Sequence, residues 1–214
     1  MLKFFYAPNT CSLATHIALI DAGAKYESVR LSFKDQDQRK PDYLAVNPKG
    51  RVPSLVTENG VLTETPALLV YIAQRFPRAN LAPLDDPFAL AQVQAFNSYL
   101  CSTVHVAHAH KMRGTRWVEP EDTAALDAMK RKIPVSMTQV FELIENDMLQ
   151  GPWVMGDHYT ICDPYLFTIA GWLKGDGVDM GKLPHVAAHH ARMAERANVK
   201  RAIAEQTSEP ALAS

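Results

Sequence analysis

Cys11 is the residue of this chain with the clearest potential for chemistry. Pro8 and Asn9 before it are turn formers, and Thr10 or Ser12 can cap the apolar-periodic segment that follows as a helix. The thiol is therefore expected beside a helix N-terminus, where the partial positive charge and the unpaired N–H groups favour a reactive thiolate. On this stretch alone, a small buried hydrophobe is an equally good interpretation.

The cysteine pattern narrows what this thiol can do. Cys11 stands where a redox protein of the thioredoxin type has Cys-x-x-Cys, but the second cysteine is absent. A lone thiolate cannot close an internal disulfide; it can form a mixed disulfide with an external thiol or act as a hydrogen-bonding anchor. Cys101 and Cys162 are far from it in sequence, so no disulfide framework is expected. Cys162 begins an apolar helical segment and is predicted to be buried.

A second candidate group lies on one face of a long helix predicted over residues 88–113. That face is too polar for a core and too poor in charge for an ordinary solvated surface, and its members are Ser98, Cys101, Ser102, His105, His108 and Met112. It suits the wall of a ligand cleft, and a solvated face carrying histidines by chance is the alternative. The opposite, apolar stripe is Val93, Phe96, Leu100, Val104 and Ala107.

The histidines do not form a convincing metal site. His105 and His108 share a helix face, but no carboxylate or cysteine of this helix completes a zinc set, so no metal is predicted. His189 and His190 are adjacent, which turns their rings in different directions, and a surface position is expected.

Charge and hydropathy exclude several classes of partner. With 22 Lys+Arg against 23 Asp+Glu the formal net charge is −1, so neither nucleic acid nor an anionic membrane is expected as a partner. No apolar run approaches the roughly 18 residues of a spanning helix, and the N-terminus enters a strand-like pattern without a signal sequence. We therefore predict a cytoplasmic protein.

Two domains are predicted to position these residues. Residues 1–77 alternate strands and helices as β-α-β, a loop over 33–42, then β-β-α; the strands are expected at 2–6, 28–31, 54–57 and 61–63, and the helices at 13–22 and 66–76. Asn59-Gly60 marks a hairpin, and Thr65 as N-cap with Pro66 at the first helical position marks a helix start. A proline-rich linker precedes an all-helical domain, 88–214, with helices near 88–113, 119–148, 160–172 and 185–205 and a frayed tail over 207–214.

The order of these elements and their motifs resembles the cytosolic glutathione S-transferases, most of all the bacterial beta class. The motifs are Cys11-Ser12, Asn47-Pro48-Lys49-Gly50, Val52-Pro53, Glu64-Thr65, Ser102-Thr103-Val104-His105, Thr160-x-x-Asp163 and the segment 193–199. Each motif is weak alone, but their order and spacing cover nearly the whole chain. The resemblance implies an α/β thioredoxin-like N-terminal domain plus an all-α C-terminal domain, a homodimer, and glutathione as co-substrate without a metal.

The resemblance also implies a glutathione site. Val52, before a cis Pro53, would offer its backbone N–H and C=O to the cysteinyl part of glutathione, as an added strand does. Glu64 would accept from the amino group, and Thr65 would hold the γ-glutamyl carboxylate at a helix N-terminus. Lys34, or alternatively Gln36, would reach the glycyl carboxylate.

Catalytic roles and a co-substrate pocket follow from the same resemblance. Cys11, Ser12 and His105 match residues near the glutathione sulfur: His105 as a base or to polarise a water, Ser12 or the Cys11 N–H as a donor to the sulfur. The segment 108–114 departs from the beta class where the co-substrate pocket is expected, with His108, Met112 and Trp172 as its residues.

The implied function is a glutathione transferase of the detoxification type. It would conjugate glutathione to small electrophiles or use it to reduce electrophilic or disulfide substrates, with thiol transfer as a possible side activity. A non-catalytic glutathione-binding or regulatory protein is the alternative, and a glutathione-dependent isomerase or dehalogenase is a third interpretation that the sequence does not separate.

Overall fold

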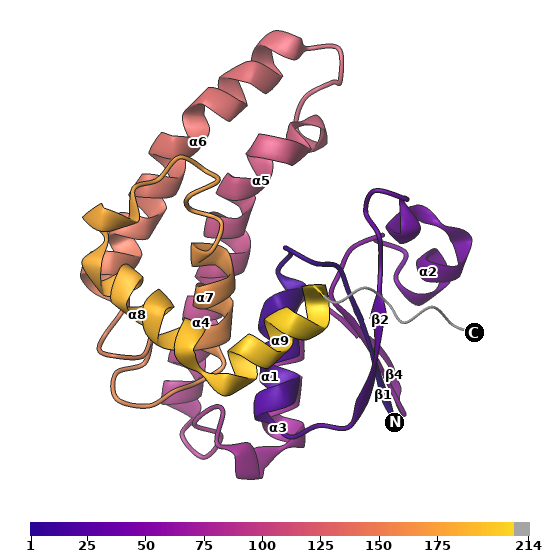
Figure 1. The fold of residues 1–214 in the computed structure, drawn as a ribbon, viewed down its shortest axis with the longest axis vertical. Helices are drawn as coiled ribbons and strands as arrows, with labels where there is room; N and C mark the ends of the chain where they lie inside the picture. Colours follow the sequence, from indigo (N-terminus) through magenta and orange to yellow (C-terminus); the bar gives the residue numbers. More distant parts are fainter. Residues whose placement is uncertain (208–214) are drawn as a thin grey trace. The chain divides into compact units, whose positions relative to one another are not determined.

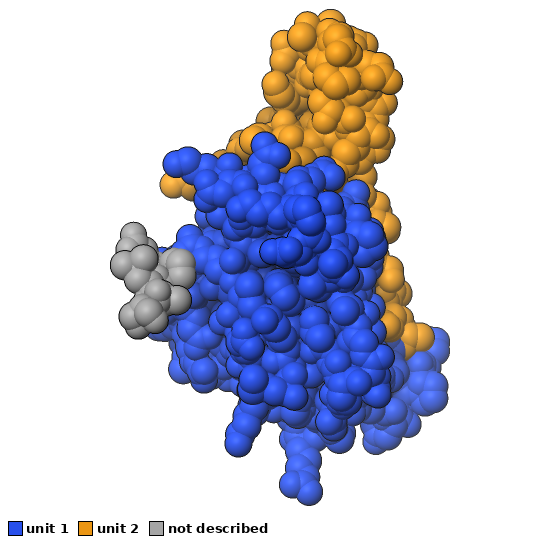
Figure 2. Space-filling model, turned by 90° about the vertical axis from the view of Figure 1, so that its right-hand side faces the viewer, with its two compact units in different colours: residues 1–90, 193–214 blue, residues 91–192 orange. Residues whose placement is uncertain are grey.

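The computed structural model describes residues 1–207 and divides into two compact units. Residues 1–90 and 193–207 form unit 1, and residues 91–192 form unit 2 (Figure 2). The predicted domain boundaries, 1–77 and 88–214, remain predictions, and the final helix belongs to unit 1 by its contacts. Apart from Thr207, the expected frayed tail lies outside the described residues.

Unit 1 is built on a four-stranded mixed sheet, as predicted. Its strands are β1 (Leu2–Tyr6), β2 (Tyr26–Arg30), β3 (Ser54–Thr57) and β4 (Gly60–Thr63). They lie in the order β2-β1-β3-β4, with β2 parallel to β1 and with β3 and β4 antiparallel to their neighbours. The parallel pair is joined by a helix, which confirms the β-α-β unit, and the Asn59-Gly60 hairpin is confirmed as well.

Helices cover both faces of this sheet (Figure 1). They are α1 (Ser12–Asp21), α3 (Thr65–Arg75) and α9 (Ala197–Thr207) on one face and α2 (Pro41–Val46) on the other. Successive side chains of β1 alternate between the faces, so Phe4 packs on His16 of α1 and Phe5 packs on Tyr43 of α2. Both phenylalanines are buried, and the sheet is the centre of the unit's core.

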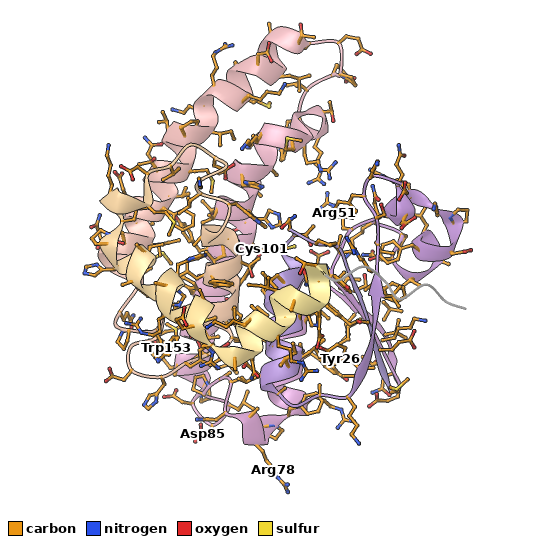
Figure 3. All side chains as sticks on the ribbon, viewed as in Figure 1. Tyr26, Arg51, Arg78, Asp85, Cys101 and Trp153 are labelled. Carbon is orange, nitrogen blue, oxygen red and sulfur yellow. The ribbon has the colours of Figure 1, made fainter. Side chains whose placement is uncertain are left out.

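Unit 2 is helical among its described residues. Its elements are most of α4 (Pro87–Tyr99), a π-helical segment η3 (Leu100–Val104), α5 (His105–Arg113), α6 (Thr123–Leu143), a second π-helical segment η5 (Ile144–Met148), α7 (Cys162–Ala170) and most of α8 (Pro184–Glu195). Cys101 lies on η3 (Figure 3). Along residues 1–207, no helix is both long enough and apolar enough to span a membrane.

The π-helical segment changes which face of the predicted 88–113 helix is buried. Val93, Leu100 and Val104 are fully buried, as the apolar stripe predicts. Beyond η3 the prediction is wrong, because Ala109 is buried and Ala107 is only partly so. A π turn adds a residue to the helical repeat and shifts the phase of everything after it.

The helical region predicted over 185–205 is confirmed, but it consists of two helices, α8 and α9, which meet at Arg196. Asp21, at the end of α1, accepts hydrogen bonds from Asn198 at 2.7 Å and from Arg196 at 3.2 Å. These bonds tie the start of α9 to α1 within unit 1. The break contains neither glycine nor proline, so no local signal marks it.

A buried histidine holds α9 against the sheet. His16 Nε2 lies 2.9 Å from the Glu205 carboxylate and 2.9 Å from the Tyr26 hydroxyl, and His16 Nδ1 lies 3.2 Å from the Gln206 amide nitrogen (Figure 3 labels Tyr26). Burial lowers the pKa of His16, and this outweighs the opposing effect of Glu205. His16 is therefore a neutral ring that donates from Nε2 and accepts at Nδ1.

This arrangement predicts a loss of stability in mild acid. A histidine whose pKa is lowered by folding takes up its proton more readily in the unfolded chain, so its stabilisation is present above about pH 6.5 and is lost as the pH falls below that value. His16→Gln is expected to make the free energy of unfolding less dependent on pH between 7 and 5.5. Urea denaturation at a series of pH values measures this slope, with exposed His158→Gln as the control. An unchanged slope in the His16 variant would contradict the assignment.

Candidate functional site

Three segments of unit 1 meet at one end of the sheet. Phe5 of β1 pairs with Ser54 of β3, and Ser54 pairs with Thr63 of β4. The chain that leaves β1 after Tyr6, the chain that enters β3 and the chain that leaves β4 therefore lie side by side. These are the segments that hold Cys11, Val52-Pro53 and Glu64-Thr65.

Cys11 begins α1 and contacts the second of these segments. The structure places it at the N-cap position of the helix, with 8% of its surface exposed. Its Sγ lies 3.6 Å from the Val52 carbonyl oxygen. The Val52-Pro53 peptide bond is cis, as the family resemblance implied.

The side chains of Ser12 and Thr10 do not cap α1. They stabilise the turn between β1 and α1. The prediction of Thr10 or Ser12 as N-cap is wrong, because Cys11 is the N-cap residue and makes no side-chain cap bond. Both hydroxyls donate toward the Ala7 carbonyl, at 3.0 Å from Ser12 and 2.8 Å from Thr10, and they lie 2.7 Å apart. A hydroxyl has one proton, so Ser12 can donate to another acceptor only by giving up a bond of this turn.

Glu64 and Thr65 begin α3, but the predicted N-cap is again one residue off. Glu64 is the N-cap residue, and its φ of 74° is unusual for a residue with a side chain. Its exposed carboxylate forms an ion pair with Lys49. Thr65 is buried, with 4% of its surface exposed. The result is a helix N-terminus with a hydroxyl and N–H groups available to an anion.

Lys34 lies in the exposed segment between β2 and α2. The segment is fixed by Asp37, which accepts from the Ser32 N–H at 2.7 Å and from Lys40 at 2.6 Å. These bonds lower the pKa of Asp37, with the Lys40 bond as the largest cause. Lys34 is not held by this network, and Gln36 beside it has a positive φ of 54°. Lys34 and Gln36 both remain predictions for the contact to the glycyl carboxylate.

In unit 2, two of the predicted residues of α5 pack on Trp172. The His105 ring centroid lies 5.1 Å from that of Trp172, and the His108 ring stacks on Trp172 at 4.4 Å and 26°. Met112 is 74% exposed. The structure thus brings His105, His108 and Trp172 together.

Asp176 belongs to the same cluster, and sequence reasoning missed it. Its buried carboxylate lies 2.6 Å from His108 Nδ1 and 3.2 Å from Lys111 Nζ. Lys111 also donates to the Gly175 carbonyl. An aspartate between two glycines looks like an ordinary turn residue in sequence, and only the fold shows that it faces α5.

Cys162 lies in the core of unit 2. Cys162 is fully buried, as predicted, and burial raises the pKa of its thiol. Its Sγ lies 3.5 Å from the Val93 carbonyl oxygen. Within the described range no three His, Cys, Asp or Glu side chains are grouped in a way that could hold a metal ion.

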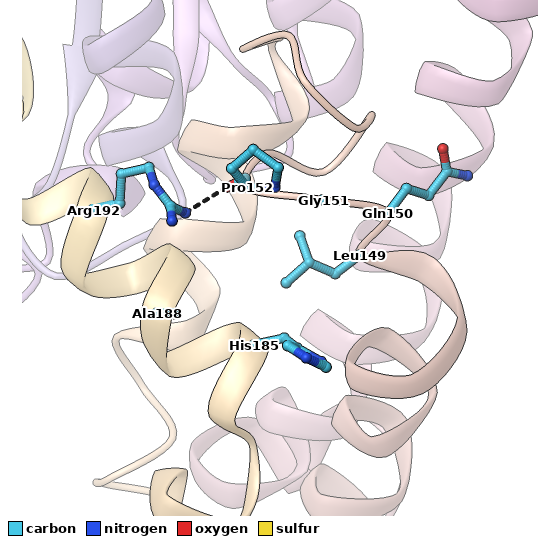
Figure 4. Close-up of a pocket in the computed structure, with 7 residues that line it drawn as sticks. All are labelled: Leu149, Gln150, Gly151, Pro152, His185, Ala188 and Arg192. Carbon is cyan, nitrogen blue, oxygen red and sulfur yellow. Dashed lines mark hydrogen bonds between the residues drawn. The ribbon is translucent and has the colours of Figure 1, made fainter.

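An open pocket of about 500 Å³ lies elsewhere in unit 2 (Figure 4). Residues 149–152 form one side and α8 forms the other, with Leu149 and His185 pointing into it. Its two basic side chains are engaged: Arg192 donates to the Pro152 carbonyl at 2.6 Å, and His185 Nδ1 lies 2.9 Å from Glu145. None of the residues considered above lines this pocket.

Comparison with known proteins gives consistent matches along the chain. The family model for the glutathione S-transferase N-terminal domain matches residues 1–74, and the model for the C-terminal domain matches residues 109–206. Glutathione S-transferase GstA of Escherichia coli O157:H7 is 32% identical over 94% of this chain and 97% of its own.

Solved structures show the same likeness. A glutathione transferase homologue from Sulfitobacter with bound glutathione is 43% identical, with a TM-score of 0.92 over 97% of this chain and 99% of its own. The bacterial beta class glutathione S-transferase of Sphingomonas chungbukensis is 32% identical, with a TM-score of 0.83 over 96% of this chain and 98% of its own.

Proposed function

Because the chain belongs to the glutathione S-transferase family, we propose that it transfers glutathione to small electrophiles, or uses it to reduce them, from a site formed by Cys11, Val52 and Thr65. The observation that carries the proposal is the strand register, which brings these three segments to one end of the sheet. The similar structure from Sulfitobacter contains bound glutathione.

Each group in this site has a part of glutathione that suits it. Val52 presents its carbonyl beside the Cys11 thiol, so the cysteinyl part of the peptide would lie along Val52 with its sulfur near Cys11. Thr65 and the N–H groups of α3 would bind the γ-glutamyl carboxylate. Glu64 would accept from the amino group of glutathione, in competition with Lys49. Lys34 or Gln36 would approach the glycyl carboxylate.

Two measurements test the function. Glutathione at a hundredfold excess over its Kd should stabilise the native protein by about 2.7 kcal/mol, which for a chain of this size raises Tm by about 5–10 °C. Conjugation of an aryl chloride should then be seen with the same preparation. Stabilisation without any turnover would favour the non-catalytic alternative, and no stabilisation would contradict a glutathione site.

Thr65→Val is expected to raise the KM for glutathione about tenfold to a hundredfold. A hydrogen bond to a charged group contributes about 1.5–3 kcal/mol, and about 1.4 kcal/mol corresponds to a factor of ten. Steady-state kinetics with glutathione as the varied substrate measures the change. Thr57→Val is the matched control, because the Thr57 hydroxyl bonds to Gly60 within the hairpin. Equal KM values in the two variants would contradict the role of Thr65.

Several finer points are part of the proposal. His105 acts at the glutathione sulfur as a base or through a water, and His108, Met112 and Trp172 belong to the co-substrate pocket. The protein works as a cytoplasmic homodimer in detoxification. Light scattering at micromolar concentration tests the dimer, and a monomer mass would contradict it.

A further inference from the structure

The open pocket beside α8 belongs wholly to unit 2 and shares no residue with the candidate glutathione site. Its volume of about 500 Å³ lies within the range of small-molecule sites, roughly 300–1,000 Å³. Leu149, Pro152 and Ala188 give it apolar walls, and His185 and Arg192 are its basic side chains. Apolar walls with a few polar groups are the usual form of a site for a small organic molecule.

Helix α8 sets the order of the groups along the pocket. His185, Ala188 and Arg192 are three and four residues apart, so they share one face of the helix. The rise along the helix axis from His185 to Arg192 is about 10 Å. Figure 4 shows these two side chains on either side of Ala188. The small side chain between them leaves the middle of the pocket apolar and places one polar group at each end.

The Arg192 guanidinium is held in place but keeps most of its donors. One of its nitrogens donates to the Pro152 carbonyl at 2.6 Å, and the group lies over the Trp153 ring, 5.5 Å from the ring centroid. A guanidinium has several further N–H groups that remain for a ligand. Within residues 1–207 Arg192 forms no ion pair, so its charge has no carboxylate partner there. Its planar fork suits a carboxylate, which it can bind by two parallel hydrogen bonds.

A buried carboxylate orients His185. Glu145, which is 7% exposed, accepts from the backbone N–H groups of His185 and Val186 at 2.8 and 2.9 Å. One Glu145 oxygen also lies 2.9 Å from His185 Nδ1. A carboxylate only accepts hydrogen bonds, so Nδ1 carries a hydrogen and Nε2 is the nitrogen that remains for a ligand. A ligand hydroxyl suits Nε2 in either protonation state, because a hydroxyl both donates and accepts.

The wall opposite α8 is already ordered. Trp153 and Gly156 exchange backbone hydrogen bonds at 3.0 and 3.1 Å, and the Gln150 N–H donates to the Val154 carbonyl at 3.2 Å. Gly151 packs so closely on this turn that a Cβ atom there would lie 2.9 Å from the Gly156 carbonyl oxygen. A ligand therefore does not have to order this wall when it binds, which removes one cost of association.

We propose that this pocket binds a small aromatic carboxylate that carries a hydroxyl group at the end opposite its carboxylate. The carboxylate pairs with Arg192, and the hydroxyl bonds to Nε2 of His185. The aromatic part lies against the apolar walls between them, because a rigid spacer loses less conformational freedom on binding than a flexible chain does. The inference does not rest on the proposed function, since the pocket is formed by other residues.

The probe is para-hydroxycinnamate, whose carboxylate and hydroxyl lie at opposite ends of a rigid apolar unit. Isothermal titration calorimetry with the full chain should give a Kd of roughly 0.1–1 mM, as expected for a ligand of about twelve non-hydrogen atoms. Cinnamate, which lacks the hydroxyl, should bind about twofold to tenfold more weakly. The methyl ester of the probe, which lacks the charge, should bind at least about tenfold more weakly.

Variants of the two end groups separate their roles. Arg192→Met should weaken binding of the probe about tenfold to a hundredfold. Arg131→Met is the matched control and should leave the Kd unchanged, because Arg131 is an exposed arginine of α6 that does not line the pocket. His185→Phe keeps an aromatic ring without Nε2, so it should bind the probe and cinnamate equally. Thermal unfolding of each variant checks that it is folded.

Three results would overturn the inference. They are absence of binding well above the expected Kd, equal binding of the probe and its methyl ester by the wild type, and an unchanged Kd in Arg192→Met, which would mean that the probe binds elsewhere on the chain. The proposed function is tested separately, because glutathione should raise the Tm of Arg192→Met as much as that of the wild type. A wild-type protein that binds the probe but is not stabilised by glutathione would contradict only the glutathione site.

Discussion

Replacing Asp163 with alanine is expected to lower the free energy of unfolding by about 3–5 kcal/mol. The side chain is completely buried at the start of α7. It accepts from the Thr160 N–H at 2.6 Å and from the Val154 N–H at 2.8 Å, and it lies 2.9 Å from His189 Nε2. Alanine leaves two buried N–H groups and a buried imidazole without their acceptor. A buried donor without an acceptor lowers the free energy of unfolding by more than a formed hydrogen bond raises it.

Urea denaturation of both proteins measures this effect. Asp163→Asn keeps an acceptor oxygen and should lie between the wild type and Asp163→Ala. Asp127→Ala, which removes an exposed ion pair with Lys130, should leave the free energy of unfolding nearly unchanged. A loss below about 1 kcal/mol in Asp163→Ala would mean that the three contacts do not stabilise the native fold.

Asp163 also shows how far sequence reasoning reaches. The spacing Thr160-x-x-Asp163 predicts the start of a helix, because an acid three residues after a capping threonine can accept from the threonine N–H. The Asp163 carboxylate does accept from the Thr160 N–H. The partner His189 was expected at the surface because it neighbours His190, and that prediction is wrong: His189 is 1% exposed. Adjacency in sequence fixes the relative directions of two rings but not which of them faces the core.

In both units, the features with a strong local signal were predicted, and those set by contacts between distant parts of the chain were not. Strong local signals, such as Asn59-Gly60 in the hairpin and Pro66 in the first turn of α3, predicted the four strands and the helices α1 and α3 of unit 1 within a few residues, whereas α2 was not predicted. The break at Arg196 depends on Asp21, a contact across most of the chain, and no local pattern carries that information. Asp176 was missed for the same reason.

The candidate site was predictable to the extent that each segment has its own motif. Cys11, Val52-Pro53 and Glu64-Thr65 were named from short sequences, and the register of β1, β3 and β4 explains why they meet. What the motifs did not indicate is how the hydroxyls are used. The Ser12 hydroxyl, for example, donates to the Ala7 carbonyl and helps to hold the turn before α1.

Cys11→Ser is expected to lower the reduction of a mixed disulfide of glutathione by at least about a hundredfold, because the thiolate is the nucleophile and a serine hydroxyl is not ionised near neutral pH. In this reaction the Cys11 thiolate attacks the glutathione sulfur and releases the small thiol. A second glutathione thiolate then attacks the Cys11 mixed disulfide and gives oxidised glutathione. The glutathione sulfur would be bound next to Cys11 Sγ, which itself lies beside the Val52 carbonyl oxygen.

The alternative role, a hydrogen-bonding anchor, predicts a different pattern in the same assays. Loss of one hydrogen bond of about 1.4 kcal/mol lowers reduction and aryl chloride conjugation alike, each by about tenfold. A nucleophile lowers reduction far more than conjugation. Cys162→Ser is the control, because that thiol is fully buried against the Val93 carbonyl and burial raises its pKa. The ratio of the two activities in Cys11→Ser therefore decides whether the thiol reacts or only holds the sulfur that does.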